Sequence, residues 1–185
     1  MLDRPWSWLR QVHGDAVVLV ASPGAGAGAE GDGLVSSAPG TALAVFTADC
    51  APIALTSAEG VIGVAHAGWR GLVAGIVERT ADRMRALGAG EISGALGPCI
   101  HAECYEFSAA DLDRVAGVLG DGVRGRTVAG APALDMQAGV RAVLERAGVM
   151  LAHDADVCTA CAAADYFSHR ARAESERQAT VVWVP

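Results

Sequence analysis

Short, almost wholly apolar runs, bounded by glycine, proline or polar residues, recur through the first hundred residues. Their length and β-branched content predict strands over residues 16–21, 41–47, 52–56, 61–66 and 92–96. Because these runs are apolar at successive positions, and not only at alternate ones, we expect a sheet that is covered on both faces. Two later runs, 149–153 and 179–184, predict further strands.

Helical spacing appears after the fourth of these runs. Residues of the apolar pattern recur every four positions, at Leu72, Ile76, Thr80 and Met84. They predict a helix over 72–87 that ends at Gly88, and similar patterns predict helices over 109–119 and 135–147. Strands gathered early and helices later indicate a mixed α/β (α+β) fold, a layered domain with mixed β-sheets flanked by helices.

The length of 185 residues suits one domain, so we expect residues 1–185 to form a single unit. Residues 23–33 read PGAGAGAEGDG, a low-complexity composition that predicts a flexible surface loop. No apolar run approaches the ~20 residues of a membrane span, and the first residues lack the pattern of a signal peptide. The expectation is a cytoplasmic protein without a membrane partner.

The formal net charge is −7, from 14 basic residues, all of them arginine, and 21 acidic ones. An acidic chain without a basic stripe argues against a nucleic-acid partner. The odd number of cysteines, five, argues against a disulfide framework and favours buried thiols or metal ligands. Nothing in the composition predicts the oligomeric state.

Three separated segments each combine a metal-ligand residue with an unusual setting. They are QVHG with His13, TADC with Cys50, and HAGWRG with His66. Two imidazoles and one thiolate suit zinc and also copper, and three protein ligands leave a fourth position for water or substrate. Taken singly, each residue is more often a packed histidine or a core cysteine, and no compact spacing links the three.

Other polar residues lie beside these candidates. Asp49 could act as a general base, or could be a turn residue that accepts hydrogen bonds from nearby amides. Arg70 could grip phosphate or carboxylate, or form a surface ion pair. Trp69 could stack on a base, although packing is the commoner role of a tryptophan.

The remaining cysteines give a weaker signal. Cys158-x-x-Cys161 lacks a second pair at matching spacing, since Cys99 and Cys104 are wider apart, so two ordinary thiols are the favoured interpretation. Residues 96–107 predict a structured loop wall in preference to a second metal site. The neighbours Ser168 and His169 lack a nucleophile elbow and do not predict a catalytic pair.

The motifs QVHG, TADC, HAGWRG, LGP…CYEF and CT…YFSHR occur in this order and resemble the YfiH-like family over nearly the whole chain. Members of that family are described variously as laccase-domain proteins, polyphenol oxidases, peptidoglycan-editing factors and purine nucleoside phosphorylases. The resemblance implies a layered α/β fold and a metal held by His13, Cys50 and His66. Family members usually carry a Thr-Arg-x-Gly-Gly type motif before QVH, and here only ten residues precede that motif.

The resemblance implies a zinc-dependent purine nucleoside phosphorylase, acting on adenosine, inosine, guanosine and methylthioadenosine, that also deaminates adenosine. In this hypothesis Arg70 holds the inorganic phosphate co-substrate, while Asp49 shuttles a proton for a water that the metal activates. The alternatives are a copper-linked polyphenol oxidase, a non-catalytic metal-binding protein, and a hydrolase of peptidoglycan precursors with Cys50 as nucleophile.

Overall fold

Two β-sheets form the centre of the protein in the computed structural model, which describes residues 4–184. The larger sheet has six strands in the order β11 (Val149–Asp154), β8 (Ile92–Leu96), β6 (Ala51–Ser57), β7 (Ile62–Ala67), β4 (Gly33–Ser36) and β2 (Val17–Leu19). The smaller sheet has the order β12 (Gln178–Trp183), β5 (Ala42–Thr47), β1 (Trp6–Arg10) and β3 (Ala29–Glu30). A hairpin of β9 (Arg124–Arg126) and β10 (Pro132–Leu134) stands apart.

Both sheets mix parallel and antiparallel pairs. In the larger sheet β6 pairs antiparallel with β7 and β8, whereas the outer pairs β11–β8 and β2–β4 are parallel. In the smaller sheet β5 pairs parallel with β1 and antiparallel with β12. The predicted mixed sheets are therefore confirmed.

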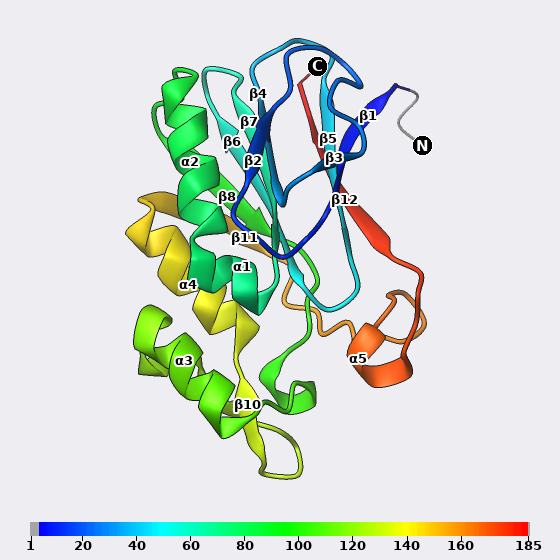
Figure 1. Ribbon diagram of the computed structural model, residues 1–185, viewed down its shortest axis with the longest axis vertical. Helices are drawn as coiled ribbons and strands as arrows, with labels where there is room; N and C mark the ends of the chain where they lie inside the picture. Colours follow the sequence, from blue (N-terminus) through cyan, green and yellow to red (C-terminus); the bar gives the residue numbers. More distant parts are fainter. Residues whose placement is uncertain (1–3, 185) are drawn as a thin grey trace.

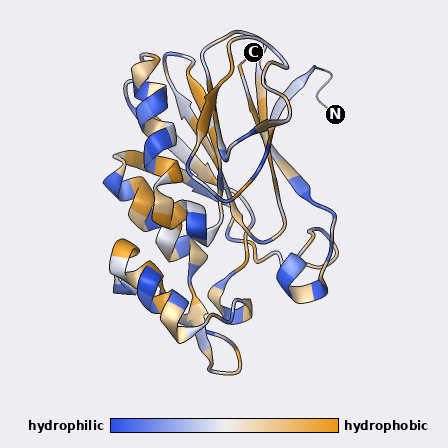
Figure 2. Cartoon of the chain, in the orientation of Figure 1, coloured by the Kyte–Doolittle hydropathy of each residue, from blue (hydrophilic) through white to orange (hydrophobic). Residues whose placement is uncertain are grey.

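The helices lie on one face of the larger sheet and the smaller sheet lies on the other (Figure 1). The helical layer contains α1 (Trp69–Ala74), α2 (Ile76–Ala86) and α4 (Met136–Arg146), with α3 (Ala109–Leu119) beyond them. The short helix α5 (His169–Arg172) lies apart from this layer, just before β12. Figure 2 shows hydrophobic residues along the strands and blue, polar residues on the outward faces of the helices.

Each side of the larger sheet has its own apolar core. Ile53, Leu55, Ile76, Met84 and Leu144 belong to the core between the sheet and the helices. A second core, between the two sheets, contains Leu9, Leu34, Leu43, Val64 and Val182. Burial on both faces explains why the strand sequences are continuously apolar, as predicted.

The predicted helix over 72–87 is wrong in one respect, since the chain breaks it at Gly75. This residue has φ 91° and ends α1, and α2 begins at the next residue. Left-handed backbone is accessible to glycine at little cost, and it interrupts an α-helix. The break turns α1 away from α2 and leaves Trp69 and Arg70 at the start of a separate short helix.

The prediction of a flexible surface loop over 23–33 is wrong for its second half. There β3 pairs with β1, and Gly33 begins β4. Asp32 is fully buried. Strand β1, whose burial alternates, was not predicted. Among residues 4–184, no helix is long and apolar enough to cross a membrane.

Candidate active site

His13, Cys50 and His66 converge at one end of the larger sheet. His13 lies between β1 and β2, Cys50 directly precedes β6, and His66 lies in β7. The antiparallel register of β6 and β7, which pairs Pro52 with His66, brings Cys50 and His66 to the same end. Their ligand atoms all lie within 4.8 Å of one another, with Cys50 Sγ 3.8 Å from His13 Nε2.

Gly68 has no side chain, and the space that this leaves is occupied by the side chains of His13 and Cys50. A Cβ atom at this position would lie 2.7 Å from His13 Cδ2 and 3.2 Å from Cys50 Sγ. The first distance is shorter than non-bonded carbon atoms tolerate, so any larger residue would displace the imidazole. The φ of Gly68 is −72°, a value that any residue can adopt, so its backbone conformation does not require glycine. Gly68 is needed because only glycine leaves space for His13 and Cys50 to approach each other.

Asp32 orients the ligands from behind. Its buried carboxylate lies 2.8 Å from His66 Nδ1 and accepts hydrogen bonds from the amides of His13 at 2.9 Å and Gly14 at 2.7 Å. Because Nδ1 of His66 is occupied by this carboxylate, Nε2 is left to bind an ion. Asp32 was not predicted from the sequence, where the only signal was an acidic residue beside a glycine-rich stretch.

The protonation of the site follows from these contacts. Burial favours a neutral Cys50 thiol, but hydrogen bonds with His13 and His66, and the charges of these imidazoles, lower its pKa to about 6. Burial also opposes charge on His66, yet hydrogen bonds with Asp32 and Cys50 raise its pKa to about 9. Despite its burial, Asp32 has a lowered pKa because His66, Gly14 and His13 donate to it. A divalent cation that binds here would displace the proton of His66 and take a ready thiolate.

Asp49 has three hydrogen-bond donors around its carboxylate. The hydroxyls of Thr159 and Ser168 donate to Oδ1 at 2.7 and 2.6 Å, and the amide of Arg170 donates to Oδ2 at 2.6 Å. The residue is 7% exposed and has φ 90°, an unusual value for a residue with a side chain. These contacts tie the segment that carries Cys50 to the loop before β12. They also show that Ser168 bonds to Asp49 and faces no base in His169.

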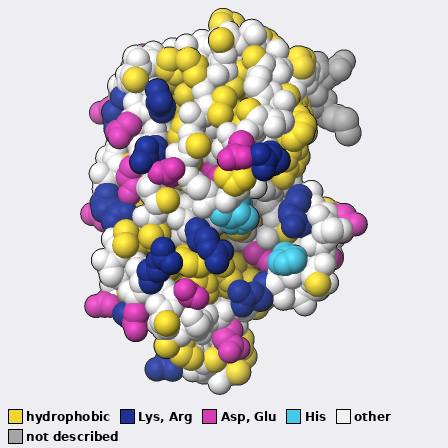
Figure 3. All heavy atoms as spheres, viewed as in Figure 1, with side chains coloured by type: hydrophobic (Ala, Val, Ile, Leu, Met, Phe, Trp, Pro, Cys, Tyr) yellow, Lys and Arg dark blue, Asp and Glu magenta, His cyan; other side chains and the backbone are white. Residues whose placement is uncertain are grey.

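A cavity of about 610 Å³ opens over the three candidate ligands. Its wall includes Gln11, Phe46, Trp69, Tyr105 and the arginines Arg70, Arg170 and Arg177. Figure 3 shows the hollow near the middle of one face, with two histidine side chains at its sides and arginines around it. A cavity of this size, with apolar walls and a few charged groups, matches the usual dimensions of a small-molecule site.

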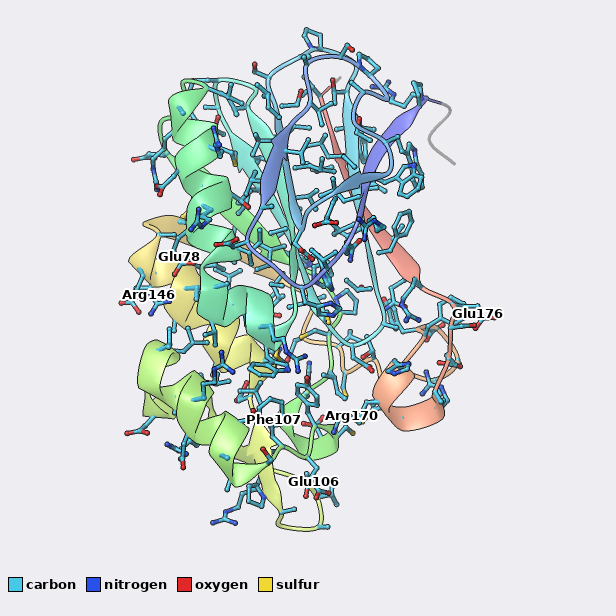
Figure 4. The ribbon with its side chains drawn as sticks, in the orientation of Figure 1. Glu78, Glu106, Phe107, Arg146, Arg170 and Glu176 are labelled. Carbon is cyan, nitrogen blue, oxygen red and sulfur yellow. The ribbon has the colours of Figure 1, made fainter. Side chains whose placement is uncertain are left out.

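Aromatic rings pack against two of the three arginines of the wall, Arg70 and Arg170. The Arg70 guanidinium lies 4.4 Å from the centre of the Trp69 ring, and Trp69 packs edge-on against Phe107 at 5.5 Å. Arg170, labelled in Figure 4 together with Glu106, lies 4.8 Å from the centre of the Tyr105 ring and donates to the carbonyl of Glu106 at 2.7 Å. Tyr105, Arg170 and Arg177 were not predicted as site residues, because only the fold brings them to the same cavity as Arg70.

The residues present fit one metal ion. Two imidazole nitrogens and one cysteine sulfur lie within 4.8 Å of one another, and all three residues line the cavity. Such a ligand set suits zinc and also copper. The fold and the site together define a layered α/β protein with a candidate nitrogen–sulfur metal site beside an arginine-lined pocket.

The chain belongs to the family described as multi-copper polyphenol oxidoreductase laccase, whose family model matches residues 1–185. A Mycobacterium tuberculosis H37Rv protein named purine nucleoside phosphorylase is 42% identical over 182 residues, 96% of this chain and 71% of the relative. A Deinococcus radiodurans protein with the same name is 44% identical over 184 residues, 96% of this chain and 69% of the relative.

Solved structures with the same fold include the hypothetical protein YfiH of Bacillus licheniformis. It superposes with a TM-score of 0.84 at 26% identity, over 97% of this chain and 74% of the other. YlmD from Geobacillus stearothermophilus superposes with a TM-score of 0.76 at 29% identity, over 96% and 72% of the two chains. These findings confirm the resemblance to the YfiH-like family and the predicted fold class.

Proposed function

We propose that this protein is a zinc-dependent purine nucleoside phosphorylase that uses inorganic phosphate as co-substrate. The observation that carries the proposal is the convergence of His13, Cys50 and His66 on the floor of a cavity whose wall carries arginines. The names of the bacterial relatives support the choice of substrate. The reaction joins a phosphate oxygen to the sugar carbon C1′ and breaks the bond from C1′ to the purine nitrogen.

The ligand set favours a single zinc ion, although the family is described as multi-copper. Multi-copper chemistry requires several coppers and many histidines, and the described residues bring only two histidines into the candidate group. When bound, zinc would supply a Lewis acid facing the cavity. His13, Cys50 and His66 would hold it, and Asp32 would fix the orientation of His66.

The arginines are proposed to bind the phosphate. Arg70 begins a helix and extends over the Trp69 ring, with Arg170 and Arg177 elsewhere on the cavity wall. Guanidinium groups bind phosphate through two parallel hydrogen bonds and keep their charge at any physiological pH. They would orient the phosphate and offset its charge as it approaches the sugar. The Trp69 and Tyr105 rings offer apolar surface on which a purine can stack.

Deamination of adenosine is the second activity proposed for the same cavity. It requires a group that moves a proton between water and the departing amine. Asp49 lies beside Cys50, but its three hydrogen bonds favour a positioning role over a shuttle. Incubation with adenosine, with and without phosphate, separates the activities because deamination yields inosine and phosphorolysis yields adenine.

The deciding experiment measures bound zinc and phosphate-dependent release of hypoxanthine from inosine. It compares the unaltered protein with His13→Ala, Cys50→Ala and His66→Ala. Each variant is expected to lose about one zinc ion per chain together with its phosphorolysis. Retention of both properties in all three variants would overturn the proposed site. If Cys50 is a nucleophile in peptidoglycan hydrolysis instead, its alkylation abolishes activity while the zinc content is unchanged.

A second experiment tests the phosphate role of Arg70. Arg70→Ala is expected to raise the KM for phosphate by about 10- to 100-fold, the usual effect of losing a charged hydrogen bond. The KM for inosine should change much less. Arg83→Ala is the matched control, because Arg83 lies on α2 and lines a different surface hollow. Equal effects of the two substitutions would refute the assignment.

A further inference from the structure

A second group of thiols lies behind the wall of the cavity. It consists of Cys104 at the end of the 3₁₀ turn Ala102–Cys104, Cys158 and Cys161 in the loop after β11, and the carboxylate of Glu103. The four ligand atoms all lie within 4.8 Å of one another. Cys104 Sγ lies 3.4 Å from Cys161 Sγ, which in turn lies 4.0 Å from the nearer oxygen of Glu103.

The surroundings of this group are those of a metal-ligand cluster. The backbone N–H of His101 donates to Cys158 Sγ at 3.4 Å, so this buried sulfur already accepts a hydrogen bond. Behind Glu103, the ring nitrogen Nδ1 of His101 lies 3.7 Å from Oε1. Cys161 and Glu103 are exposed, which leaves a path for an ion from solvent. The sequence offered no second pair of ligands for Cys158 and Cys161. In the structure Cys104 and Glu103 take that place, and Cys99 lies outside the group.

We propose that Cys104, Cys158, Cys161 and Glu103 bind a second zinc ion, separate from the one proposed in the cavity. Three thiolates and a carboxylate form a closed four-ligand set of the kind that characterises structural zinc. Zinc–sulfur bonds of about 2.3 Å in tetrahedral geometry separate two sulfurs by roughly 3.8 Å, so 3.4 Å requires only a small adjustment. A disulfide would require the same sulfurs to close to about 2.05 Å.

An ion at this position would fix the cavity wall. Cys104 is followed by Tyr105, which lines the cavity under Arg170. Cys158 is followed by Thr159, whose hydroxyl donates to Asp49 beside Cys50. The ion would therefore clamp two loops, 97–107 and 155–170, that are far apart in sequence. We infer a structural role, because all four coordination positions would be filled by the protein.

The test counts zinc in protein that has been purified under reducing conditions and dialysed. The unaltered chain is expected to hold about one zinc ion per chain more than Cys104→Ser or Cys161→Ser. Cys99→Ser is the matched control, since it also removes one thiol but should retain the full zinc content. Cys161 is exposed, so its serine variant is expected to fold, with unfolding followed by circular dichroism. The difference of one ion is independent of the cavity site and of any phosphorylase activity.

Cobalt substitution supplies a second readout. Sulfur-to-cobalt charge-transfer absorption scales with the number of thiolates, so Cys161→Ser should lose more of this absorption than Cys50→Ser. Glu103→Gln should weaken zinc retention against a chelator, whereas Glu106→Gln should not. Equal zinc in the unaltered chain and Cys161→Ser would overturn the proposal. So would intact-mass detection of a Cys104–Cys161 disulfide in protein that was purified under reducing conditions and then incubated with zinc.

Discussion

The Asp32 carboxylate lies 2.8 Å from His66 Nδ1 and bonds the backbone of the segment that carries His13. One buried side chain thereby fixes two of the three candidate ligands, which come from segments distant in sequence. A carboxylate behind a metal-binding histidine sets which ring nitrogen faces the ion and raises the basicity of the ring.

Asp32→Asn is expected to lower zinc affinity by about 10- to 100-fold. Asparagine keeps the size of the side chain but loses the negative charge and one acceptor oxygen, so His66 is held less firmly. Zinc affinity is measured by competition with a chelating dye. Asp15→Asn, which alters an exposed partner of Arg79, should leave the affinity unchanged. An Asp32→Asn protein with unaltered affinity would show that Asp32 serves folding alone.

Gly68→Ala is expected to reduce zinc binding with little loss of secondary structure. The added methyl group would meet the His13 imidazole at 2.7 Å, and this exposed side chain can rotate out of the site while Asp32 still holds its backbone. Gly117→Ala is the opposite case. Gly117 lies in the exposed interior of α3 with open space around it, so alanine should stabilise the protein by about 0.5–1 kcal/mol. Zinc titration and thermal unfolding of both variants separate the two effects; full zinc binding by Gly68→Ala would contradict the account.

Asp49 is predicted to position the loop that carries Ser168 and Arg170. Asp49→Ala leaves two hydroxyls and one amide without their acceptor and should cost about 2–4 kcal/mol of unfolding free energy. Asparagine tolerates the left-handed backbone and keeps an acceptor for the amide, while the hydroxyls can rotate.

Asp49→Asn should consequently retain most of its stability and its phosphorylase turnover. Denaturant unfolding and kcat for inosine, measured on the same preparations, decide between the two roles. A large loss of deamination by Asp49→Asn at unchanged stability would instead establish Asp49 as the proton shuttle.

The ion pair of Arg141 with Asp154 should stabilise the folded protein at neutral pH, and this stabilisation should be lost as the pH falls into the acidic range. Arg141 Nη2 lies 2.6 Å from Asp154 Oδ2. Burial alone would raise the pKa of Asp154, but the amide of Asp156 and the Arg141 guanidinium lower it below the ordinary 3.8. A lowered carboxyl pKa stabilises the fold above pH 3.8, and this contribution is lost as the pH falls through the lower, folded value.

At pH 7 we therefore expect Arg141→Gln to be less stable than the unaltered protein by about 0.5–1 kcal/mol. The difference should shrink below about pH 4 and vanish once Asp154 is protonated in both proteins. Urea unfolding over this pH range measures it. Arg126→Gln, whose guanidinium bonds a carbonyl and no carboxylate, should show no such trend. A difference that grows with acidity would contradict the argument.

The sequence pattern predicted buried strands well because their burial on two faces leaves a continuous apolar run. It located the strand Ile92–Leu96 and the helix Ala109–Leu119 at their observed bounds. It missed the break at Gly75, because Ile76 and Met84 continue the apolar spacing across the change of direction. The spacing of apolar side chains does not predict where a single residue adopts left-handed backbone.

The site was less predictable because long-range pairing assembles it. The pairing of Gly33 with Ala65 in β4 and β7 places Asp32 beside His66, and nothing near Asp32 in the sequence indicates this. The same holds for Arg170, which is held at the cavity by long-range contacts of its amide with Asp49 and of its guanidinium with Glu106. The motifs of the sequence singled out the candidate ligands one by one, the family resemblance joined them into one site, and their roles stay predictions.

Two residues of the site have left-handed backbone without being glycine: His13 at φ 61° and Asp49 at φ 90°. Such backbone costs a residue with a Cβ roughly 1–2 kcal/mol, which a glycine would recover. At Asp49 the loss of three hydrogen bonds outweighs this gain, so selection of variants for heat resistance alone would drift toward glycine at His13 and remove one candidate ligand. Thermostabilisation of this protein needs a screen for catalytic turnover beside the one for melting temperature.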